Sequence, residues 1–535
     1  MALLVSIATL VGCSADRLPA AEQGPASTTE HTAQTTDTDS PSPRLSGDAA
    51  GPPPTPPDEA SSAAFAIDLT APGRPIDDRV FGTNVPAWLG PDTLASDWFR
   101  TALAESGATT IRMPGGSWST VYGWSACERR LDDGCIWEGA ARPSDFAALL
   151  SASGLHGIWT VSPNETAQSA AAVVSFFNGD RDDDTVIGVD RNGVDWGTVA
   201  DWAGLRAEGG HTEPVRVAMW EVGNEVYGAR QSTGGGDCAP FGWEEAWTCD
   251  GAEYVTGNEL HDGYLDIRAE MLAVDPTIEV GAVGVREPSS WGDWGNEVLE
   301  AADGEIDFYI VHHYAYDQPP DIADASRAAT QWPDVVADAR EGLPDDVPLA
   351  ITEYNLVAFE AGDTTQTMTK VGNALFIADT LGRLASAGVP IANQWNLANG
   401  TTESGTDYGL VSADGSVRFP QFHALATWAG RGPTLLEVDR GDQGDEVEVY
   451  ATQRADGTLA LIAIHFSDDV TSVPIVLEGA PAADGTMRVT AHVGENADAE
   501  QFAQAVITDD AFGSGALEVE LGPWSINLIE LRFDG

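Results

Sequence analysis

Two glutamates, Glu225 and Glu353, each follow the end of an apolar run. The run Met219–Val222 leads into Gly223-Asn224-Glu225, and the run 348–352 leads directly into Glu353. A pair of carboxylic acids flanking a sugar bond is the usual machinery of glycoside hydrolysis. The residue types therefore predict paired-carboxylate chemistry, provided that the fold brings the two strand ends together.

A parallel barrel would bring them together. Eight apolar runs alternate with helix-like stretches, which is typical of an α/β fold of the (β/α)8 TIM-barrel type. Catalytic residues of such barrels lie at the C-terminal ends of the strands. We expect the barrel over residues 64–430, with strands at 80–85, 109–113, 157–161, 217–222, 278–283, 308–312, 349–352 and 391–395. Helices are expected at 95–106, 166–177, 260–274, 322–339 and 367–387.

After Trp428 the pattern changes to short alternating strands separated by Gly/Asp turns. This pattern is typical of a β-sandwich. We expect it over residues 431–535, with strands at 446–452, 459–466, 472–477, 487–493 and 525–532. The early alternating segment 65–70 has no place in an eight-stranded barrel, so we expect it to join the sandwich and tie the two domains together.

Three polar side chains at predicted strand ends are candidates for the site. Arg112 ends the second strand beside a Gly-rich turn, where it could hold a carboxylate or form a structural ion pair. The two-residue period of the sixth strand places His312 and Tyr314 on one face, and the Tyr314 hydroxyl could bond a carboxylate. The adjacent histidines lack a third ligand, so no metal site is expected.

Aromatic side chains follow several of the same strands. The eighth strand ends in Gln394-Trp395, where an indole could form a floor for the apolar face of a sugar ring. Trp88, Trp118 and Trp124 follow the first two strands and could extend that platform or pack in the core. Together they favour a saccharide-binding cleft.

The composition limits the partners. The chain has 535 residues, 43% of them hydrophobic, with a formal net charge of −58 and Lys370 as its one lysine. The electrostatic field of so large a negative charge repels nucleic acid and anionic membrane surfaces, so we expect a neutral carbohydrate substrate. The acidity is also what solubility or adaptation to salt would produce. No cofactor is indicated, and the oligomeric state stays open.

The N-terminus predicts a membrane anchor. Residues 1–13 are mostly apolar and end in Leu10-Val11-Gly12-Cys13, which resembles the lipobox of bacterial lipoproteins, lipidated at Cys13. The segment is too short to span a bilayer. Residues 14–63 are rich in Pro, Ser and Thr and predict a disordered tether, so the chain would reach the membrane only through its lipid.

The other four cysteines form two close-spaced pairs, Cys127 with Cys135 and Cys238 with Cys249. Local pairing in an oxidising compartment is the simplest of the three possible connectivities. We therefore expect two disulfides on the cleft side of the barrel. They also indicate an exported protein, either a cell-envelope lipoprotein or a periplasmic or extracellular enzyme.

Three motifs carry a family resemblance: Arg112-Met113-Pro114-Gly115-Gly116, then Val222-Gly223-Asn224-Glu225, then Thr352-Glu353-Tyr354-Asn355. They resemble clan A retaining glycoside hydrolases, above all the family 51 α-L-arabinofuranosidases. The resemblance covers about 65–535, because that family also carries a sandwich after its barrel. It implies Glu225 as acid/base, Glu353 as nucleophile and Asn224 as a contact to the hydroxyl beside the reacting carbon. It also implies a pocket lined by Arg112, His312 and Tyr314.

The sequence departs from that family at three places. Family 51 usually has Asn where this chain has Ser117, Asp-Glu-Trp where it has Thr352-Glu353-Tyr354, and a first-strand glutamate that is absent from 81–90. One alternative is therefore an endo-acting β-glycanase related to families 39 or 44, which the additional tryptophans favour. A second is a catalytically inactive surface lipoprotein that only binds glycan.

The mechanism that this resemblance implies is double displacement with retention of configuration. It requires carboxyl groups about 5 to 5.5 Å apart. The two acids must also differ in pKa. We expect hydrogen bonds from Arg112 and Tyr314 to keep Glu353 ionised, while Glu225 holds the proton.

Overall fold

The structure is a computed structural model. It describes residues 64–534, except for 132–133, 136–137, 236–237, 241, 360–361, 401–404, 442–443, 482–483 and 514. The predicted lipidation site Cys13 and the linker 14–63 lie outside the described residues. Among the helices of the described part, none has the length and apolar character that a membrane span requires.

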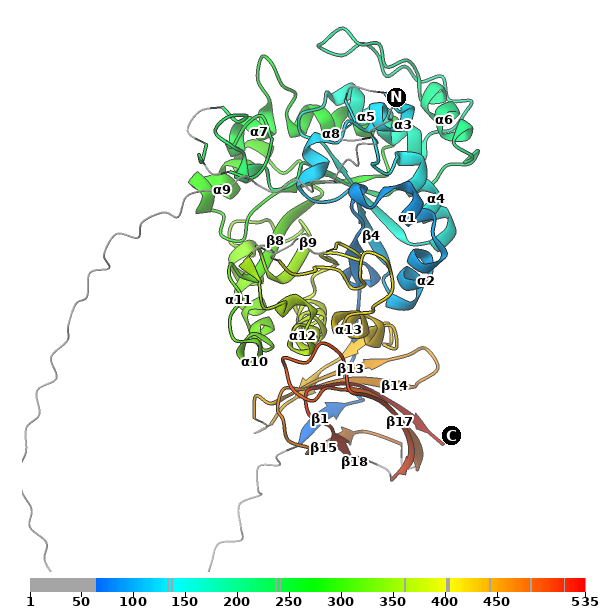
Figure 1. The fold of residues 1–535 in the computed structure, drawn as a ribbon, viewed down its shortest axis with the longest axis vertical. Helices are drawn as coiled ribbons and strands as arrows, with labels where there is room; N and C mark the ends of the chain where they lie inside the picture. The colour runs from blue at the N-terminus through cyan, green and yellow to red at the C-terminus, as the bar shows by residue number, and fades with distance from the viewer. Residues whose placement is uncertain are drawn as a thin grey trace, which may run out of the picture. The chain divides into compact units, whose positions relative to one another are not determined.

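Eight parallel strands close into the predicted TIM barrel. They follow one another in chain order, and the last pairs with the first. Helices surround them (Figure 1), so both strand faces are buried, which explains the continuous apolar runs. The strands are β3 (Gly82–Asn84), β4 (Thr110–Met113), β5 (His156–Val161), β6 (Met219–Val222), β7 (Glu279–Val283), β8 (Phe308–Tyr316), β9 (Leu349–Val357) and β10 (Ile391–Gln394).

Two barrel strands are longer than the sequence pattern predicts. β8 and β9 stay paired as far as Tyr316 and Val357, beyond the apolar runs that end near residues 312 and 352. The register places His312 opposite Glu353 and Tyr314 opposite Asn355. The extension therefore carries Tyr314 and Glu353 on paired backbone that begins just after a shift in the register of the two strands.

The helices are α1 (Gly90–Ala95), α2 (Asp97–Ser106), α3 (Trp124–Arg129), α4 (Pro143–Ser153), α5 (Ala167–Asn178), α6 (Val199–Glu208), α7 (Gly251–Thr256), α8 (Tyr264–Val274), α9 (Ser290–Ala302), α10 (Ile322–Ala325), α11 (Trp332–Arg340), α12 (Val371–Ala387) and α13 (Pro420–Trp428). The single helix predicted at 322–339 is wrong, because a 3-10 turn separates α10 from α11. Pro333 explains the break: proline lacks the N–H that a helix interior requires and is accepted only in a first turn.

The C-terminal residues form the predicted β-sandwich. One sheet has the order β12-β1-β15-β18 and the other β17-β16-β19-β14-β13-β11-β2. The strands are β1 (Phe65–Asp68), β2 (Arg74–Pro75), β11 (Thr434–Leu436), β12 (Val438–Asp439), β13 (Val447–Gln453), β14 (Leu459–His465), β15 (Thr471–Glu478), β16 (Gly485–Val493), β17 (Gln504–Phe512), β18 (Ala516–Leu521) and β19 (Ser525–Phe533).

The N-terminal strand β1 belongs to the sandwich, as predicted. It pairs in parallel with β15 and antiparallel with β12, and it appears in Figure 1 as the blue strand among the orange and red ones. Sequence reasoning missed β17, whose residues are mostly exposed. Because β17 is an edge strand with two adjacent acidic residues, it lacks the apolar alternation by which strands are found.

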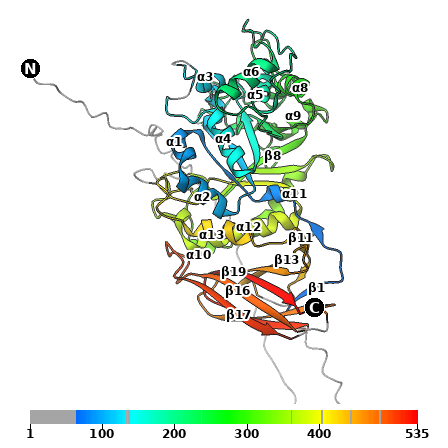
Figure 2. The same ribbon diagram turned by 90° about the vertical axis from the view of Figure 1, so that its right-hand side faces the viewer.

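Helices α12 and α13 lie between the barrel and the sandwich (Figures 1 and 2). They contact β14 and β19. Buried Tyr450 of β13 donates its hydroxyl to Asp379 of α12, and Arg383 of α12 forms an ion pair with Glu448 (2.8 Å). The two domains are therefore joined by a packed and hydrogen-bonded interface.

A histidine pair at this interface predicts acid sensitivity. The rings of His423 (α13) and His492 (β16) lie 4.4 Å apart. Burial, with the charges of His492 and Arg418, lowers the pKa of His423 from 6.5 to about 4. The unfolded chain therefore binds this proton at a higher pH than the folded one, and stability is lost as pH falls from about 6.5 to 4. We expect a smaller loss in His423→Gln, measured by urea unfolding at several pH values. Equal pH slopes in both proteins would contradict the assignment.

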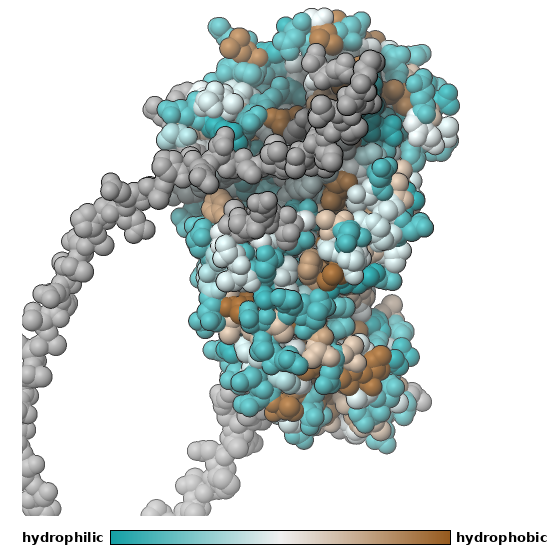
Figure 3. Space-filling model, in the orientation of Figure 1, coloured by the Kyte–Doolittle hydropathy of each residue, from teal (hydrophilic) through white to brown (hydrophobic). Residues whose placement is uncertain are grey.

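The face of the molecule that Figure 3 draws is predominantly hydrophilic. In Figure 3 teal residues cover most of the coloured face, and apolar residues form small separate patches. This agrees with the large acidic excess of the sequence. A surface cavity of about 660 Å³ is lined by residues that begin the barrel strands, such as His156 and Glu279. It therefore lies at the end of the barrel opposite the two candidate glutamates.

Candidate active site

Arg112 is the centre of a buried network at the C-terminal end of the barrel. It lies on β4 and is fully buried. Its Nε donates to Glu221 Oε2 (2.6 Å), its Nη1 to Asn84 Oδ1 (3.1 Å) and Glu353 Oε2 (3.2 Å), and its Nη2 to Asn224 Oδ1 (2.8 Å). One permanent cation thus fixes polar side chains from the β3, β6 and β9 segments.

Glu221 is a member of this network that sequence reasoning missed. It is fully buried in β6, pairs with Arg112 and accepts a hydrogen bond from Thr160 Oγ1 (3.0 Å). A carboxylate inside the apolar run Met219–Val222 was the available signal, since a buried charge requires a partner. Glu221 therefore supplies a negative charge that allows the Arg112 cation to be buried.

Glu353 is held by side chains from β4 and β8. The Tyr314 hydroxyl donates to Oε1 (2.6 Å) and Arg112 Nη1 donates to Oε2 (3.2 Å). His312 Nδ1 lies 3.7 Å from Oε2. Tyr314 and His312 therefore face the same carboxylate, as the two-residue period predicts.

Glu225 is held by a different set of donors. Trp243 Nε1 donates to Oε2 (2.6 Å), the Tyr227 hydroxyl donates to Oε1 (3.2 Å), and His312 Nδ1 lies 3.1 Å from Oε1. The backbone of Glu225 is left-handed, with φ of 39°. Residues with a side chain rarely adopt this conformation, which persists where surrounding contacts enforce it.

The two carboxylates and His312 form one compact cluster. One oxygen of Glu225, one of Glu353 and a ring nitrogen of His312 lie within 4.8 Å of one another. Within the described part of the chain, this is the one group whose spacing would suit a metal ion. A metal there would meet the Arg112 cation, 3.2 Å from Glu353, and would compete with the tyrosine and indole donors. These hydrogen-bond donors favour a proton shared between Glu225 and Glu353 over a bound metal ion.

The pKa values shift in directions opposite to the prediction. Burial raises the pKa of Glu353; His312, Arg112 and Tyr314 act against this, but the charge of Glu225 reinforces it. Burial also acts to raise the pKa of Glu225, but hydrogen bonds and charge from His312, with hydrogen bonds from Trp243 and Tyr227, lower it below its usual value. The lowering at Glu225 comes first from His312, which the sequence places in the site, and then from Trp243 and Tyr227, which the sequence does not reveal.

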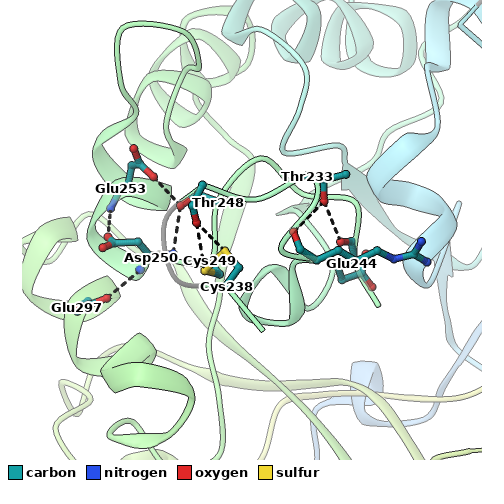
Figure 4. Close-up of a disulfide and its surroundings, with 11 residues drawn as sticks. Thr233, Cys238, Glu244, Thr248, Cys249, Asp250, Glu253 and Glu297 are labelled. Atoms are coloured by element: carbon teal, nitrogen blue, oxygen red, sulfur yellow. Dashed lines mark hydrogen bonds between the residues drawn. A yellow bond between two sulfur atoms is a disulfide. The ribbon is translucent and has the colours of Figure 1, made fainter. Parts of the chain in front are cut away.

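One of these unpredicted donors, Trp243, comes from a loop closed by a disulfide, which we call the strap (residues 238–249). Figure 4 shows the disulfide between Cys238 and Cys249 together with Glu244. Trp243 directly precedes Glu244 in the strap. Beyond Cys249, the Asp250 side chain caps α7 by accepting from the backbone N–H of Glu253 (2.7 Å). The disulfide joins the two ends of the strap, and the cap holds the chain directly after Cys249.

Glu244 of the strap is a further buried carboxyl group near the site. Its Oε1 accepts from Asn224 Nδ2 (2.8 Å), and its Oε2 accepts from Thr120 Oγ1 (2.7 Å). Burial and the charge of Glu225 raise its pKa to about 7. Because Arg112 occupies Oδ1 of Asn224, the two contacts together fix which way the amide of Asn224 points. The flanking cysteines were the only sequence signal for this loop.

Removal of Glu244 should therefore impair the site without unfolding the protein. In Glu244→Ala, Asn224 loses the acceptor that orients its amide, and we expect about a tenfold or larger fall in kcat/KM. Glu245→Gln is the matched control, because the neighbouring Glu245 is exposed and pairs with Arg230 (3.5 Å). Steady-state kinetics with thermal unfolding would measure both. Equal activity of the two variants at equal stability would show that Glu244 does not position Asn224.

The predicted aromatic platform is present in part. The Trp88 ring centroid lies 5.4 Å from that of Trp118 and 5.7 Å from that of Trp395. Trp88 and Trp118 are partly exposed. Gly116 lies against the Trp395 indole, where a Cβ would clash. Trp124 does not belong to the platform: it is buried, packs against Trp202 (4.8 Å) and donates to Ser169 Oγ (3.0 Å). Of the two places that the sequence leaves open for Trp124, the cleft or the core, the structure shows the core.

The Gln394 side chain forms hydrogen bonds within the barrel. It is fully buried, and its Nε2 donates to the backbone oxygens of Trp395 (2.7 Å) and Tyr408 (3.1 Å). Its Oε1 accepts from Thr83 Oγ1 (3.2 Å) on the neighbouring strand. The side chain thus joins β10 to β3, the strands at which the barrel closes.

Both predicted disulfides are present, Cys127–Cys135 and Cys238–Cys249. They lie in the connections that follow the C-terminal ends of β4 and β6, and hence at the end of the barrel that carries the two glutamates. Two such bonds are compatible with an exported protein.

The fold has clear relatives among solved structures. The α-L-arabinofuranosidase of family 51 from Thermotoga petrophila is 18% identical, with a TM-score of 0.68 over 88% of this chain and 100% of that one. The α-L-arabinofuranosidase from Thermotoga maritima, solved with arabinose, is 18% identical, with a TM-score of 0.67 over 87% of this chain and 99% of that one. The family 44 xyloglucanase from Paenibacillus polymyxa is 13% identical, with a TM-score of 0.55 over 88% and 99%.

At the sequence level no family model matches the chain, and no curated protein is significantly similar to it. The structural likeness therefore establishes the fold. This chain has the barrel-and-sandwich fold of family 51 α-L-arabinofuranosidases, as the sequence motifs predict.

Proposed function

We propose that this protein is a retaining O-glycoside hydrolase that acts on a neutral saccharide, with an activity like that of α-L-arabinofuranosidases. The observation that carries the proposal is the pair Glu225, which follows β6, and Glu353, which lies in β9, with an oxygen of each within 4.8 Å of the other. This closeness supports double displacement, which uses carboxyl groups about 5 to 5.5 Å apart, rather than inversion, which uses about 6.5 to 9.5 Å.

In the first step Glu353 attacks the anomeric carbon and forms a glycosyl ester. Tyr314 and Arg112 hold its two oxygens and so orient the attacking lone pair. Glu225 donates its proton to the leaving oxygen as the glycosidic bond breaks. Asn224, oriented by Arg112 and Glu244, contacts the hydroxyl beside the reacting carbon.

In the second step Glu225, now ionised, takes a proton from water, and the water attacks the anomeric carbon from the side that the leaving group vacated. The ester bond to Glu353 breaks, and the carboxylate is restored. Two inversions at one carbon give net retention.

The first step requires one proton on the pair, and it must be on Glu225. The two carboxyl groups titrate as a coupled unit, so between their macroscopic pKa values the pair holds one proton. In the free protein the neighbours favour its position on Glu353. Positive charge that develops at the anomeric carbon favours ionised Glu353 instead, and the 3.1 Å contact between His312 and Glu225 offers a route for proton transfer.

An endo-acting β-glycanase is the second candidate. The observation that favours it is the presence of aromatic residues beyond the two glutamates, with Trp88 and Trp118 partly exposed and Trp291 exposed. The relatives by fold include a bifunctional glucanase-xylanase from a metagenome library, with a TM-score of 0.54 at 14% identity over 88% of this chain and 99% of that one. A long cleft with several aromatic contacts would suit a polysaccharide chain.

A substrate panel tests the proposal. Purified protein would be incubated with aryl glycosides, including arabinofuranosides, and with neutral polysaccharides, and the products would be separated by length. Release of single sugars supports the arabinofuranosidase-like activity, and oligosaccharide ladders support the endo-glycanase. Binding without hydrolysis across the panel would contradict both and favour a glycan-binding protein without catalysis.

The proposal includes export. The two disulfides support an oxidising compartment, and lipidation at Cys13 would tether the enzyme to the envelope. A Cys13→Ser variant expressed in a bacterial host should then move from the membrane fraction to the soluble one.

A further inference from the structure

Three aromatic side chains extend from Glu225 to the protein surface. Tyr227 and Trp243 both donate hydrogen bonds to the Glu225 carboxylate. The Trp291 ring lies 5.2 Å from that of Tyr227 and 5.3 Å from that of Trp243. We call Tyr227, Trp243 and Trp291 the aromatic wall. An exposed indole is thus separated from the acid/base carboxylate by one ring contact and one hydrogen bond.

Trp291 is exposed to an extent that packing alone does not explain. Its relative exposure is 46%, whereas Trp294, three residues further along α9, is fully buried. The backbone at Trp291, Gly292 and Asp293 is left-handed, with φ of 53°, 76° and 78°. Two of these three residues carry side chains, for which this conformation is unfavourable. Strain of this kind is often found at ligand-binding positions.

We infer that the aromatic wall binds the leaving-group sugar of the substrate, an inference that rests on the proposed function. A group that protonates the leaving oxygen must lie within hydrogen-bond distance of it. Rings that contact Glu225 therefore border the leaving group, whereas Tyr314 and Arg112 border the sugar that becomes bonded to Glu353. The apolar C–H face of a pyranose or furanose packs against an aromatic ring, and the exposed Trp291 is available for such a contact.

The wall also predicts the class of substrate. An enzyme that released small alcohols or phosphate would gain nothing from an exposed indole beyond its acid/base. A bound sugar next to the cleaved bond requires a saccharide leaving group. The substrate is accordingly an oligosaccharide or polysaccharide, and the wall holds the residue on the leaving side of the cleaved linkage.

The test compares substrates that reach the wall with one that does not. A glycosyl fluoride of the sugar identified in the panel has a leaving group too small to contact Trp291, whereas the matching oligosaccharide places a ring there. In Trp291→Ala we expect kcat/KM for the oligosaccharide to fall about tenfold. The value for the fluoride should stay unchanged. Trp291→Tyr, which keeps a ring, should recover most of the loss.

Ile507→Ala is the matched control, because Ile507 is an exposed large apolar residue on β17 of the sandwich. A second measurement adds the oligosaccharide as an acceptor to the fluoride reaction. The wall predicts transglycosylation products with wild type and few with Trp291→Ala, at equal rates of fluoride release.

Equal losses on both substrates would overturn the inference, because Trp291 would then act only through Trp243 and Glu225. No loss on either substrate would also overturn it. A wild-type protein that is inactive on the fluoride and on every glycoside would contradict the proposed function itself, which separates the two failures.

Discussion

Glu353→Ala should abolish hydrolysis of every glycoside, whatever its leaving group. The variant has no carboxylate to attack the anomeric carbon, and no other described side chain takes its place between Tyr314 and Arg112. We expect kcat/KM to fall by at least about 10⁴-fold, which corresponds to over about 5 kcal/mol in the activation barrier. Stopped assays with a nitrophenyl glycoside and with polysaccharide would measure it.

Azide distinguishes loss of the nucleophile from general damage. In Glu353→Ala azide can occupy the vacated space and attack once, giving a glycosyl azide of inverted configuration. Recovered activity with a product of retained configuration would show that Glu353 is not the nucleophile. Glu353→Gln, which keeps the hydrogen-bonding shape but not the charge, should be equally inactive.

Glu225→Ala should impair poor and good leaving groups unequally. The variant lacks the proton donor, which a sugar alkoxide needs and a nitrophenolate hardly needs. We expect kcat/KM to fall about 10²–10⁴-fold on polysaccharide and far less on an activated aryl glycoside. The second step lacks its base, so a burst of nitrophenolate followed by slow turnover should appear in stopped-flow traces.

Azide should then accelerate turnover of Glu225→Ala, because it needs no deprotonation, and its product should keep the configuration of the substrate. Tyr227→Phe offers a milder control, since it removes one hydrogen bond to Glu225 but leaves the carboxyl group in place. An inverted azide product would exchange the roles assigned to Glu225 and Glu353. Equal losses on both kinds of leaving group would contradict the acid role.

The barrel and its two glutamates were predictable because their signals are local. A buried parallel strand is a continuous apolar run, and the residue that follows it lies at the catalytic end of a TIM barrel. Arg112, His312 and Tyr314 were predictable for the same reason, since each lies at or near the end of such a run. The interrupted helix at Pro333 was missed because the surrounding apolar pattern continued through it.

The parts that were not predictable depend on contacts distant in sequence. Trp243 and Glu244 lie in a strap without helical or strand periodicity, and they reach Glu225 and Asn224 only once the chain has folded. The lowered pKa of Glu225 depends in part on the hydrogen bond from Trp243. Trp124 follows a strand end just as Trp118 does, and only the packing of α5 and α6 decides that it is buried.

The covalent intermediate provides the most direct test of the central claim. Glu225→Ala would be mixed with the activated aryl glycoside that the wild-type protein cleaves fastest, quenched during the burst, digested with trypsin and analysed by mass spectrometry. Arg340 and Lys370 bound a tryptic peptide, residues 341–370, that contains Glu353. We predict one glycosyl unit on this peptide, located at Glu353 by fragmentation. A glycosyl unit on another residue, or nitrophenolate release without any glycosylated peptide, would contradict catalysis by double displacement at Glu353.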